Sequence, residues 1–207
     1  MRTEPLNLLF VCTANISRSP YAERRARMLL GDAPITVASA GVPGYPGRSM
    51  DREMAAQLEL RGGEPEGHVS RSLDGDILGW ADLALTFEFA HDLKIFERWP
   101  EAWERVFGLK QFAQAVTEFD AAAMTGSALT SAARRVAGGN SMGWDVDDPY
   151  HRGQRAAETA AASIDKAVES VVRGLLGLPA AGDGPRRADP SRHGGRGDSV
   201  LPWSSRK

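Results

Sequence analysis

The sequence of 207 residues contains a single cysteine, and this scarcity narrows the chemistry that it can support. One cysteine cannot form an internal disulfide or a cysteine-rich zinc site. An excess of either charge is also lacking, because 25 Lys and Arg residues stand against 27 Asp and Glu residues. A general nucleic-acid binder would need a basic surplus, so the balance argues against that class.

Long apolar runs are missing as well. A run such as Leu8 to Cys12 is far too short to cross a bilayer, and the residues after Met1 do not resemble a signal peptide. The hydrophobic content of 42% is ordinary for a chain that buries one core. We therefore expect a cytoplasmic protein with no membrane insertion.

Short apolar segments alternate with helical patterns along most of the chain. The expected strands cover 6–11, 35–39, 83–87 and 105–109, and the expected helices cover 20–30, 54–60, 89–99, 111–116 and 156–176. Strands that alternate with helices form parallel sheets. The sequence thus predicts an α/β fold with three layers, in which helices cover both faces of a four-stranded parallel sheet.

Two segments depart from this pattern. Residues 120–139 are rich in Ala, Gly and Ser and predict one helix between loops, but the role of the stretch 111–144 does not follow from its sequence. Residues 179–207 are dense in Pro, Gly, Arg, Asp and Ser, and such a composition cannot bury enough surface to offset chain entropy. We predict a folded domain over 1–178 and a disordered tail over 179–207.

The loop from Cys12 to Pro20, Cys-Thr-Ala-Asn-Ile-Ser-Arg-Ser-Pro, follows the first strand and opens the first helix. Free N–H groups and the positive end of the helix dipole make such a helix start an anion site. Arg18 adds a planar fork that matches two phosphate oxygens, and the same positive field favours the thiolate form of Cys12. A thiolate that faces a phosphate is a nucleophile aimed at phosphorus. The spacing alone also suits a buried structural cysteine.

Two neighbours have supporting roles in this interpretation. Ser19 is placed to donate a hydrogen bond to the sulfur of Cys12, and Asn15 is placed to hold the loop open by bonding nearby backbone groups. The four histidines lie far apart in the sequence and lack the spacing of zinc motifs, so we expect them at the surface or at helix caps.

The segment Val11 to Pro20 resembles the signature of the low-molecular-weight protein tyrosine phosphatases, V-C-x-G-N-I-C-R-S-P. Four later segments resemble the family in the same order along the chain: Ser39–Gly41, Gly47–Asp51, Ala81–Thr86 and Asp148–Tyr150. The resemblance spans residues 6 to 177, and the first loop carries most of it.

This resemblance implies a two-step reaction that uses no metal and no cofactor. Cys12 attacks the phosphate and forms a phosphocysteine, while Asp148 protonates the departing phenolate and then activates water. Arg18 and the loop N–H groups hold the phosphate oxygens. The phosphate-binding loop comprises Thr13, Ala14, Asn15, Ile16, Ser17, Arg18 and Ser19. Tyr45 and Tyr150 would form walls around the phosphotyrosine ring.

The chain also departs from the family pattern. Ala14 stands where the family has Gly, and if this position needs a positive φ, Ala strains the loop by about 1 kcal/mol or more. Ser17 stands where many members carry a second Cys, so Cys12 lacks a redox partner. Asp147 precedes Asp148 directly and stays the alternative choice for the acid.

Two other functions remain open on the sequence. An arsenate reductase on the same fold could work with Cys12 and a small-molecule thiol, and a non-catalytic module could bind phosphate or phosphotyrosine at the same loop. The segment that begins at Asp148 favours a phosphatase, because an aryl leaving group needs a proton donor and walls. The expected partner is a phosphotyrosine protein, and the candidates include a bacterial tyrosine kinase.

Overall fold

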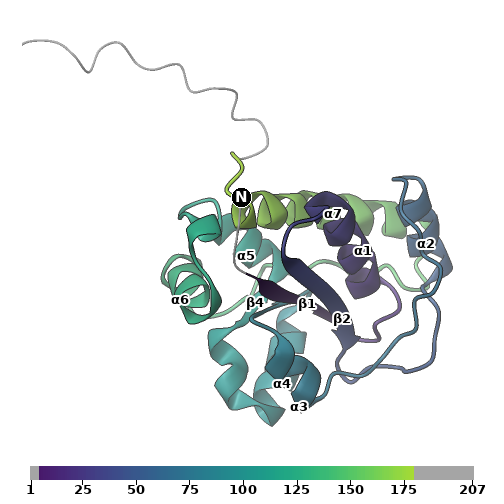
Figure 1. Cartoon of the computed structure of the whole chain (residues 1–207). Helices are drawn as coiled ribbons and strands as arrows, with labels where there is room; N and C mark the ends of the chain where they lie inside the picture. The colour runs from purple at the N-terminus through teal and green to yellow at the C-terminus, as the bar shows by residue number, and fades with distance from the viewer. Residues whose placement is uncertain (1–4, 180–207) are drawn as a thin grey trace, which may run out of the picture.

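A computed structural model describes residues 5–179, and in it a parallel four-stranded sheet lies between two layers of helices (Figure 1). The strands are β1 (Leu6–Cys12), β2 (Ile35–Gly41), β3 (Leu83–Thr86) and β4 (Val106–Gly108). Their order in the sheet is β2-β1-β3-β4. Cys12 pairs with Gly41, and Val11 pairs with Thr86, so the carboxyl ends of these strands lie at one edge of the sheet. Ligands of open parallel sheets bind at this edge.

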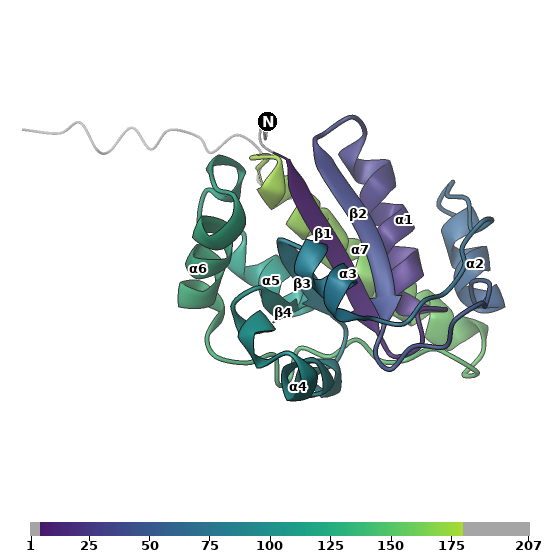
Figure 2. The same ribbon diagram turned by 60° about the horizontal axis from the view of Figure 1, so that its bottom comes forward.

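The two helical layers differ in size. One face carries α1 (Arg18–Leu30), α2 (Arg52–Glu59), α5 (Leu109–Ala115) and the long α7 (Gln154–Leu175), and the other face carries α3 (Gly75–Trp80) and α4 (Phe89–Arg98) (Figure 2). The helix α6 (Gly126–Ala137) packs beside α5 and beside the 3-10 turn η1 (Pro100–Glu104). A second 3-10 turn, η2 (Ala121–Ala123), precedes α6.

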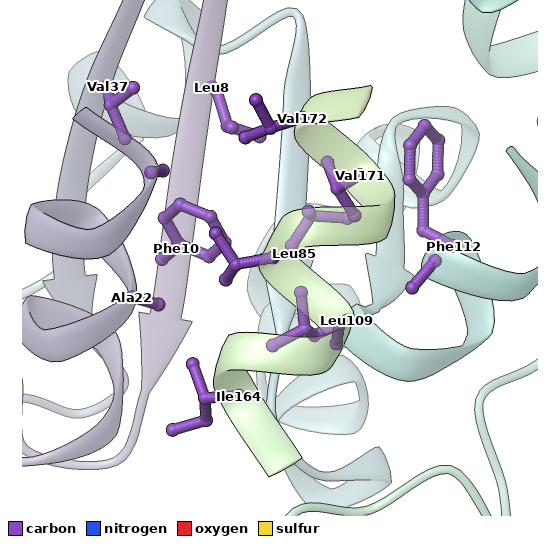
Figure 3. Close-up of a cluster of buried hydrophobic side chains, with 14 of the residues drawn as sticks. Leu8, Phe10, Ala22, Val37, Leu85, Leu109, Phe112, Ile164, Val171 and Val172 are labelled. Carbon is purple, nitrogen blue, oxygen red and sulfur yellow. The ribbon is translucent and has the colours of Figure 1, made fainter. Parts of the chain in front are cut away.

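β1 is apolar along nearly its whole length because both of its faces are covered. Leu8 and Phe10 point to the layer of α1 and α7, where Leu8 lies beside Val172 (Figure 3). Leu9 belongs to the second core cluster, together with residues of α3 and α4. The sheet is thereby fixed from both sides, and its carboxyl edge becomes a rigid support for the loops that follow it.

The predicted α/β/α fold is confirmed, and the four predicted strands agree with the observed ones to within about two residues at each end, the usual uncertainty of such boundaries. The helix expected in 120–139 is α6. The sequence analysis missed α3, whose two glycines obscure its helical pattern; its first turn is capped by Asp74, which accepts a hydrogen bond from the backbone of Ile77.

Two predictions concern the C-terminal tail and membrane insertion. The predicted disordered tail lies outside the described residues from 180 onward, so the domain boundary at 178 stays a prediction. Between residues 5 and 179, no helix combines the length and the apolar character that a membrane span requires.

Candidate active site

The loop after β1 forms the floor of a cavity of about 350 Å³ at the carboxyl edge of the sheet. The cavity is lined by Cys12, Thr13, Ala14, Ile16, Ser17, Arg18, Tyr45, Arg48, Asp148 and Tyr150. The structure therefore brings together residues from both ends of the chain that the sequence singled out. Cys12 is almost fully buried at the end of β1, and its Sγ lies 3.0 Å from Ser19 Oγ, as expected for a hydroxyl that donates to the sulfur.

Arg18 opens α1, and its side chain is only 1% exposed. Its Nη1 contacts the Glu88 carboxylate and donates to the Val146 carbonyl at 2.8 Å, while Nη2 lies 3.1 Å from Asp148 Oδ2. Its Nε has no hydrogen-bond partner among the described residues. Buried donors are rarely left unpaired, so this free N–H fits a fork built to hold an anion.

Asn15 fixes the shape of the loop. It is completely buried, and its Nδ2 donates to Ser19 Oγ at 3.1 Å and to Ser39 Oγ at 2.8 Å. Its Oδ1 accepts a hydrogen bond from the backbone of Arg71 at 2.9 Å. One of the three side-chain partners of Asn15 is thus a backbone group, as expected, and the other two are hydroxyl groups.

The left-handed turn of the loop falls at Asn15, whose φ is 60°, and not at Ala14. The strain expected for Ala in place of Gly therefore does not arise, and Asn tolerates this conformation better than most residues. A close approach occurs instead at Gly41. A Cβ there would lie 2.8 Å from the Ala14 carbonyl carbon and 2.9 Å from the Asn15 nitrogen, so only glycine lets β2 pass beside the loop.

His91 is a site residue that sequence reasoning missed. It caps α4 as expected, because its Nδ1 accepts from the Glu88 backbone at 3.1 Å, but it is also fully buried. The ring proton must then sit on Nε2, which donates to Thr13 Oγ1 at 2.9 Å. Burial, followed by the charge of Arg18, lowers the pKa of His91 to about 3, so the ring is neutral.

Two further contacts could not be read from spacing. His68 is half buried, and its Nε2 lies 2.7 Å from the Asn15 carbonyl oxygen, so it contacts the phosphate loop from the edge of the protein surface. Glu88 lies two residues beyond β3, at the same sheet edge as the loop. The sequence could have indicated Glu88 only through its position just after a predicted strand, because residues there lie at the edge of the sheet where ligands bind.

The acid candidates occupy different places. Asp148 lines the cavity that contains Cys12, and its side chain is 43% exposed. Asp147 is exposed and absent from that lining; it borders a neighbouring cavity of about 490 Å³. Asp148 Oδ1 accepts from the Tyr150 backbone at 3.3 Å, which turns the chain so that the Tyr150 side chain also reaches the catalytic cavity. The geometry favours Asp148.

The mouth of the cavity combines apolar and aromatic side chains with the exposed Arg48. Ile16 lies within the loop, and Tyr45 and Tyr150 stand at the rim, with Tyr45 56% exposed. Ser17, which occupies the place of the second family cysteine, is buried, and its Oγ has no hydrogen-bond partner within the described part of the chain.

Comparison with known proteins agrees with this geometry. The family model described as low molecular weight phosphotyrosine protein phosphatase matches residues 7–123. The low molecular weight protein-tyrosine-phosphatase Ptp of Acinetobacter johnsonii is 35% identical over 104 residues, which make up 50% of this chain and 71% of that protein.

Solved structures extend the similarity over most of the chain. The YwlE arginine phosphatase from Geobacillus stearothermophilus superimposes with a TM-score of 0.66 at 26% identity, over 84% of this chain and 94% of that one. Wzb of Vibrio vulnificus, in complex with benzylphosphonate, has a TM-score of 0.64 at 25% identity, over 83% of this chain and 100% of that one.

Proposed function

Because the chain belongs to the low molecular weight phosphotyrosine protein phosphatase family, we propose that it hydrolyses phosphotyrosine in proteins, and small aryl phosphates, through a phosphocysteine. One observation carries the proposal: a single cavity brings together a nucleophile, an anion-binding guanidinium and a proton donor, which are Cys12, Arg18 and Asp148. A module that only bound phosphate would have no use for the first or the last of these groups.

The buried guanidinium positions the phosphate. Glu88 and the Val146 carbonyl hold one side of Arg18, so the fork cannot rotate away from the loop. A bound phosphate competes with the Asp148 carboxylate for Nη2, which frees this carboxyl group to face the leaving oxygen. The loop N–H groups and Arg18 then hold the oxygens on which charge lies in the transition state.

In the first step, Cys12 Sγ attacks phosphorus, the bond from phosphorus to the phenolic oxygen breaks, and Asp148 gives its proton to that oxygen. Ser19 Oγ accepts from Asn15 Nδ2, and its one proton can be shared between the Ala40 carbonyl at 3.3 Å and the sulfur 3.0 Å away. A thiolate is the stronger acceptor, so the ionised sulfur draws this proton. In the second step, Asp148 takes a proton from water, which attacks the phosphocysteine and releases phosphate and the Cys12 thiolate.

The shape of the mouth supports an aryl substrate. Ile16, Tyr45 and Tyr150 line the entrance with apolar and aromatic surface, against which a flat phenyl ring can pack. Arsenate needs neither such walls nor a proton donor. We further propose a cytoplasmic protein that acts on phosphotyrosine proteins such as a bacterial tyrosine kinase, since a reducing compartment keeps a catalytic thiol in its active form.

The first test compares substrates and one variant. The wild-type protein should hydrolyse a phosphotyrosine peptide faster than a phosphoarginine peptide of the same sequence, and it should not consume thiol with arsenate. Cys12→Ser should abolish turnover while vanadate still binds. Faster hydrolysis of phosphoarginine, or turnover by Cys12→Ser within tenfold of the wild type, would contradict the proposal.

The second test identifies the acid. Asp148→Ala should lower kcat for phenyl phosphate by about 10²- to 10⁴-fold, because the phenolate then leaves unprotonated. The loss in kcat/KM should shrink for 2,4-dinitrophenyl phosphate, because kcat/KM reports only the steps up to the phosphocysteine and this leaving group needs no proton. Asp147→Ala is the matched control, and a larger effect there would show that the acid is the other carboxyl.

A further inference from the structure

A buried carboxylate on α4 contacts the segment that leads to the catalytic acid. We call residues 138–150 the acid loop, because they run from the end of α6 to Asp148 and Tyr150. Ser141 of this loop is only 1% exposed, and its Oγ donates to Asp92 Oδ2 at 2.5 Å. The other oxygen, Oδ1, accepts from Thr86 Oγ1 at 2.6 Å. Asp92 thus ties the acid loop to the end of β3.

The contact at Ser141 is followed by others nearer the site, at Asp145 and at Val146. Five residues further on, the Val146 backbone N–H donates to the Phe87 carbonyl at 2.7 Å, and the Val146 carbonyl accepts from Arg18. Asp148 comes only two residues later. The chain between Ser141 and Asp148 is therefore held at both of its ends, and little freedom remains for the acid.

The start of the acid loop is fixed to β4 and α5. Gln111 Nε2 donates to the carbonyl groups of Ala137 and Asn140, at 3.1 and 2.7 Å. A Cβ at Gly108 would lie 2.7 Å from Ser141 Cβ, so glycine is needed for Ser141 to reach Asp92. Arg134 of α6 donates to the Val106 carbonyl at 2.7 Å. The segment 111–144, whose role does not follow from its sequence, therefore places Ser141 against α4.

The chemistry of the contact explains why a carboxylate occupies this place. Both hydroxyl groups donate to Asp92, so the ionised form, which only accepts, satisfies them together. Such charge-assisted bonds are stronger than bonds between neutral groups, and an unpaired carboxylate would be costly in this buried position. An amide at position 92 accepts at one atom only, so its NH2 group would have to donate to the other hydroxyl, and neither bond would be assisted by a charge.

We propose that Asp92 is a positioning residue for the general acid: through Ser141 it holds the acid loop so that Asp148 stays beside Arg18 and the leaving oxygen. This inference rests on the proposed role of Asp148. It assigns to the segment 111–144 a function in catalysis, because α6 and the turn after it carry Ser141 to the contact.

The test uses the leaving group as its readout. Ser141→Ala removes one bond to the buried carboxylate, and kcat/KM for phenyl phosphate should fall about 10- to 100-fold, the loss expected for one hydrogen bond to a charged group. The loss of kcat/KM for 2,4-dinitrophenyl phosphate should stay below about threefold, because the first step with this leaving group needs no proton donor and kcat/KM does not include the later attack of water. Asp92→Asn should show the same selective loss.

Thr130→Val is the matched control. Thr130 is a buried hydroxyl of α6 that donates to the Ser127 carbonyl and forms no hydrogen bond with the acid loop within the described residues. This variant should leave the ratio of the two rates unchanged. An equal loss on both substrates in Ser141→Ala, or an unchanged ratio, would show that the contact is merely structural and would overturn the proposal.

A double variant separates this proposal from the one on which it rests. If Ser141 acts through Asp148, adding Ser141→Ala to Asp148→Ala should not slow phenyl phosphate hydrolysis further. Additive losses would refute the positioning role while leaving Asp148 as the acid. If Asp148→Ala alone had no effect on this substrate, the proposed acid itself would be wrong.

Discussion

Asn15 contributes to the stability of the phosphate loop in two ways: its side chain forms hydrogen bonds, and its backbone tolerates a left-handed conformation. Replacing Asn15 with Ala or with Gly separates these two contributions. Asn15→Ala removes three buried hydrogen bonds, to Ser19, to Ser39 and from the backbone of Arg71. Each contributes roughly 0.5–1.5 kcal/mol, so their loss should lower the free energy of unfolding by about 3 kcal/mol. Ala also resists the left-handed conformation, where φ is 60°, by a further 1–2 kcal/mol or so.

Asn15→Gly is the matched variant, because it loses the same bonds but accepts the positive φ. Glycine thereby avoids the cost of the left-handed conformation. Its unfolded chain has more conformational entropy, however, and this lowers the stability of the glycine variant by about 0.4–1 kcal/mol. Its free energy of unfolding should therefore exceed that of Asn15→Ala by roughly 0.5–1 kcal/mol.

Urea unfolding at equilibrium measures both differences, provided that the slope against urea is the same in all three proteins. Turnover gives a second readout. In both variants Ser19 loses the donor that orients it, so kcat for p-nitrophenyl phosphate should fall by about tenfold or more, and glycine should not restore it. A loss of less than about 1 kcal/mol in Asn15→Ala, or a glycine variant less stable than the alanine one, would refute this reasoning.

Three further predictions concern pH, oxidation and the chain end. Burial holds the pKa of His91 near 3, below the ordinary value of 6.5, so the unfolded chain binds the extra proton between these values and stability falls as the pH drops through this window. The free energy of unfolding should therefore depend less steeply on pH between about 6.5 and 4 in His91→Gln than in the wild type, and equal slopes would contradict a buried neutral ring. Peroxide should inactivate the enzyme, and dithiothreitol added later should restore little activity, because the only cysteine cannot close a disulfide. Bound phosphate should protect Cys12, Ser17→Cys should make recovery substantial, and full recovery of the unmodified protein would argue against this account. A chain that ends at Leu178 should fold and turn over p-nitrophenyl phosphate normally, and a melting temperature several degrees lower would show that the remaining residues pack on the domain.

The positions of Cys12 and Arg18 could be predicted because they depend on residues that are neighbours in the sequence. A buried strand that ends in Cys12 and a helix that begins at Arg18 place both groups at the same strand-to-helix junction, whatever the rest of the fold does. The pattern of apolar runs likewise predicted the sheet and the long α7. Asp148 was predicted through family resemblance, since nothing in its own neighbourhood distinguishes it from Asp147.

The supporting residues could not be predicted, because they reach the loop through space. His91 lies 78 residues from its partner Thr13, and His68 lies 53 residues from Asn15. In the sequence each is an isolated polar residue, and only the packing of α4 and of the segment before α3 against the loop shows its partner. The same holds for Asp92, whose carboxylate finds Ser141 across 49 residues.

The central claim is that phosphate passes through the sulfur of Cys12, and trapping this intermediate tests it most directly. Asp148→Ala lacks the base that activates water, so with p-nitrophenyl phosphate, whose leaving group departs easily, the phosphorylated enzyme should accumulate. Rapid acid quenching followed by peptide mass spectrometry should find the phosphate on the peptide that contains Cys12, and Cys12→Ala should show neither adduct nor turnover. Turnover without an adduct on Cys12, or a phosphate carried by another residue, would contradict the account.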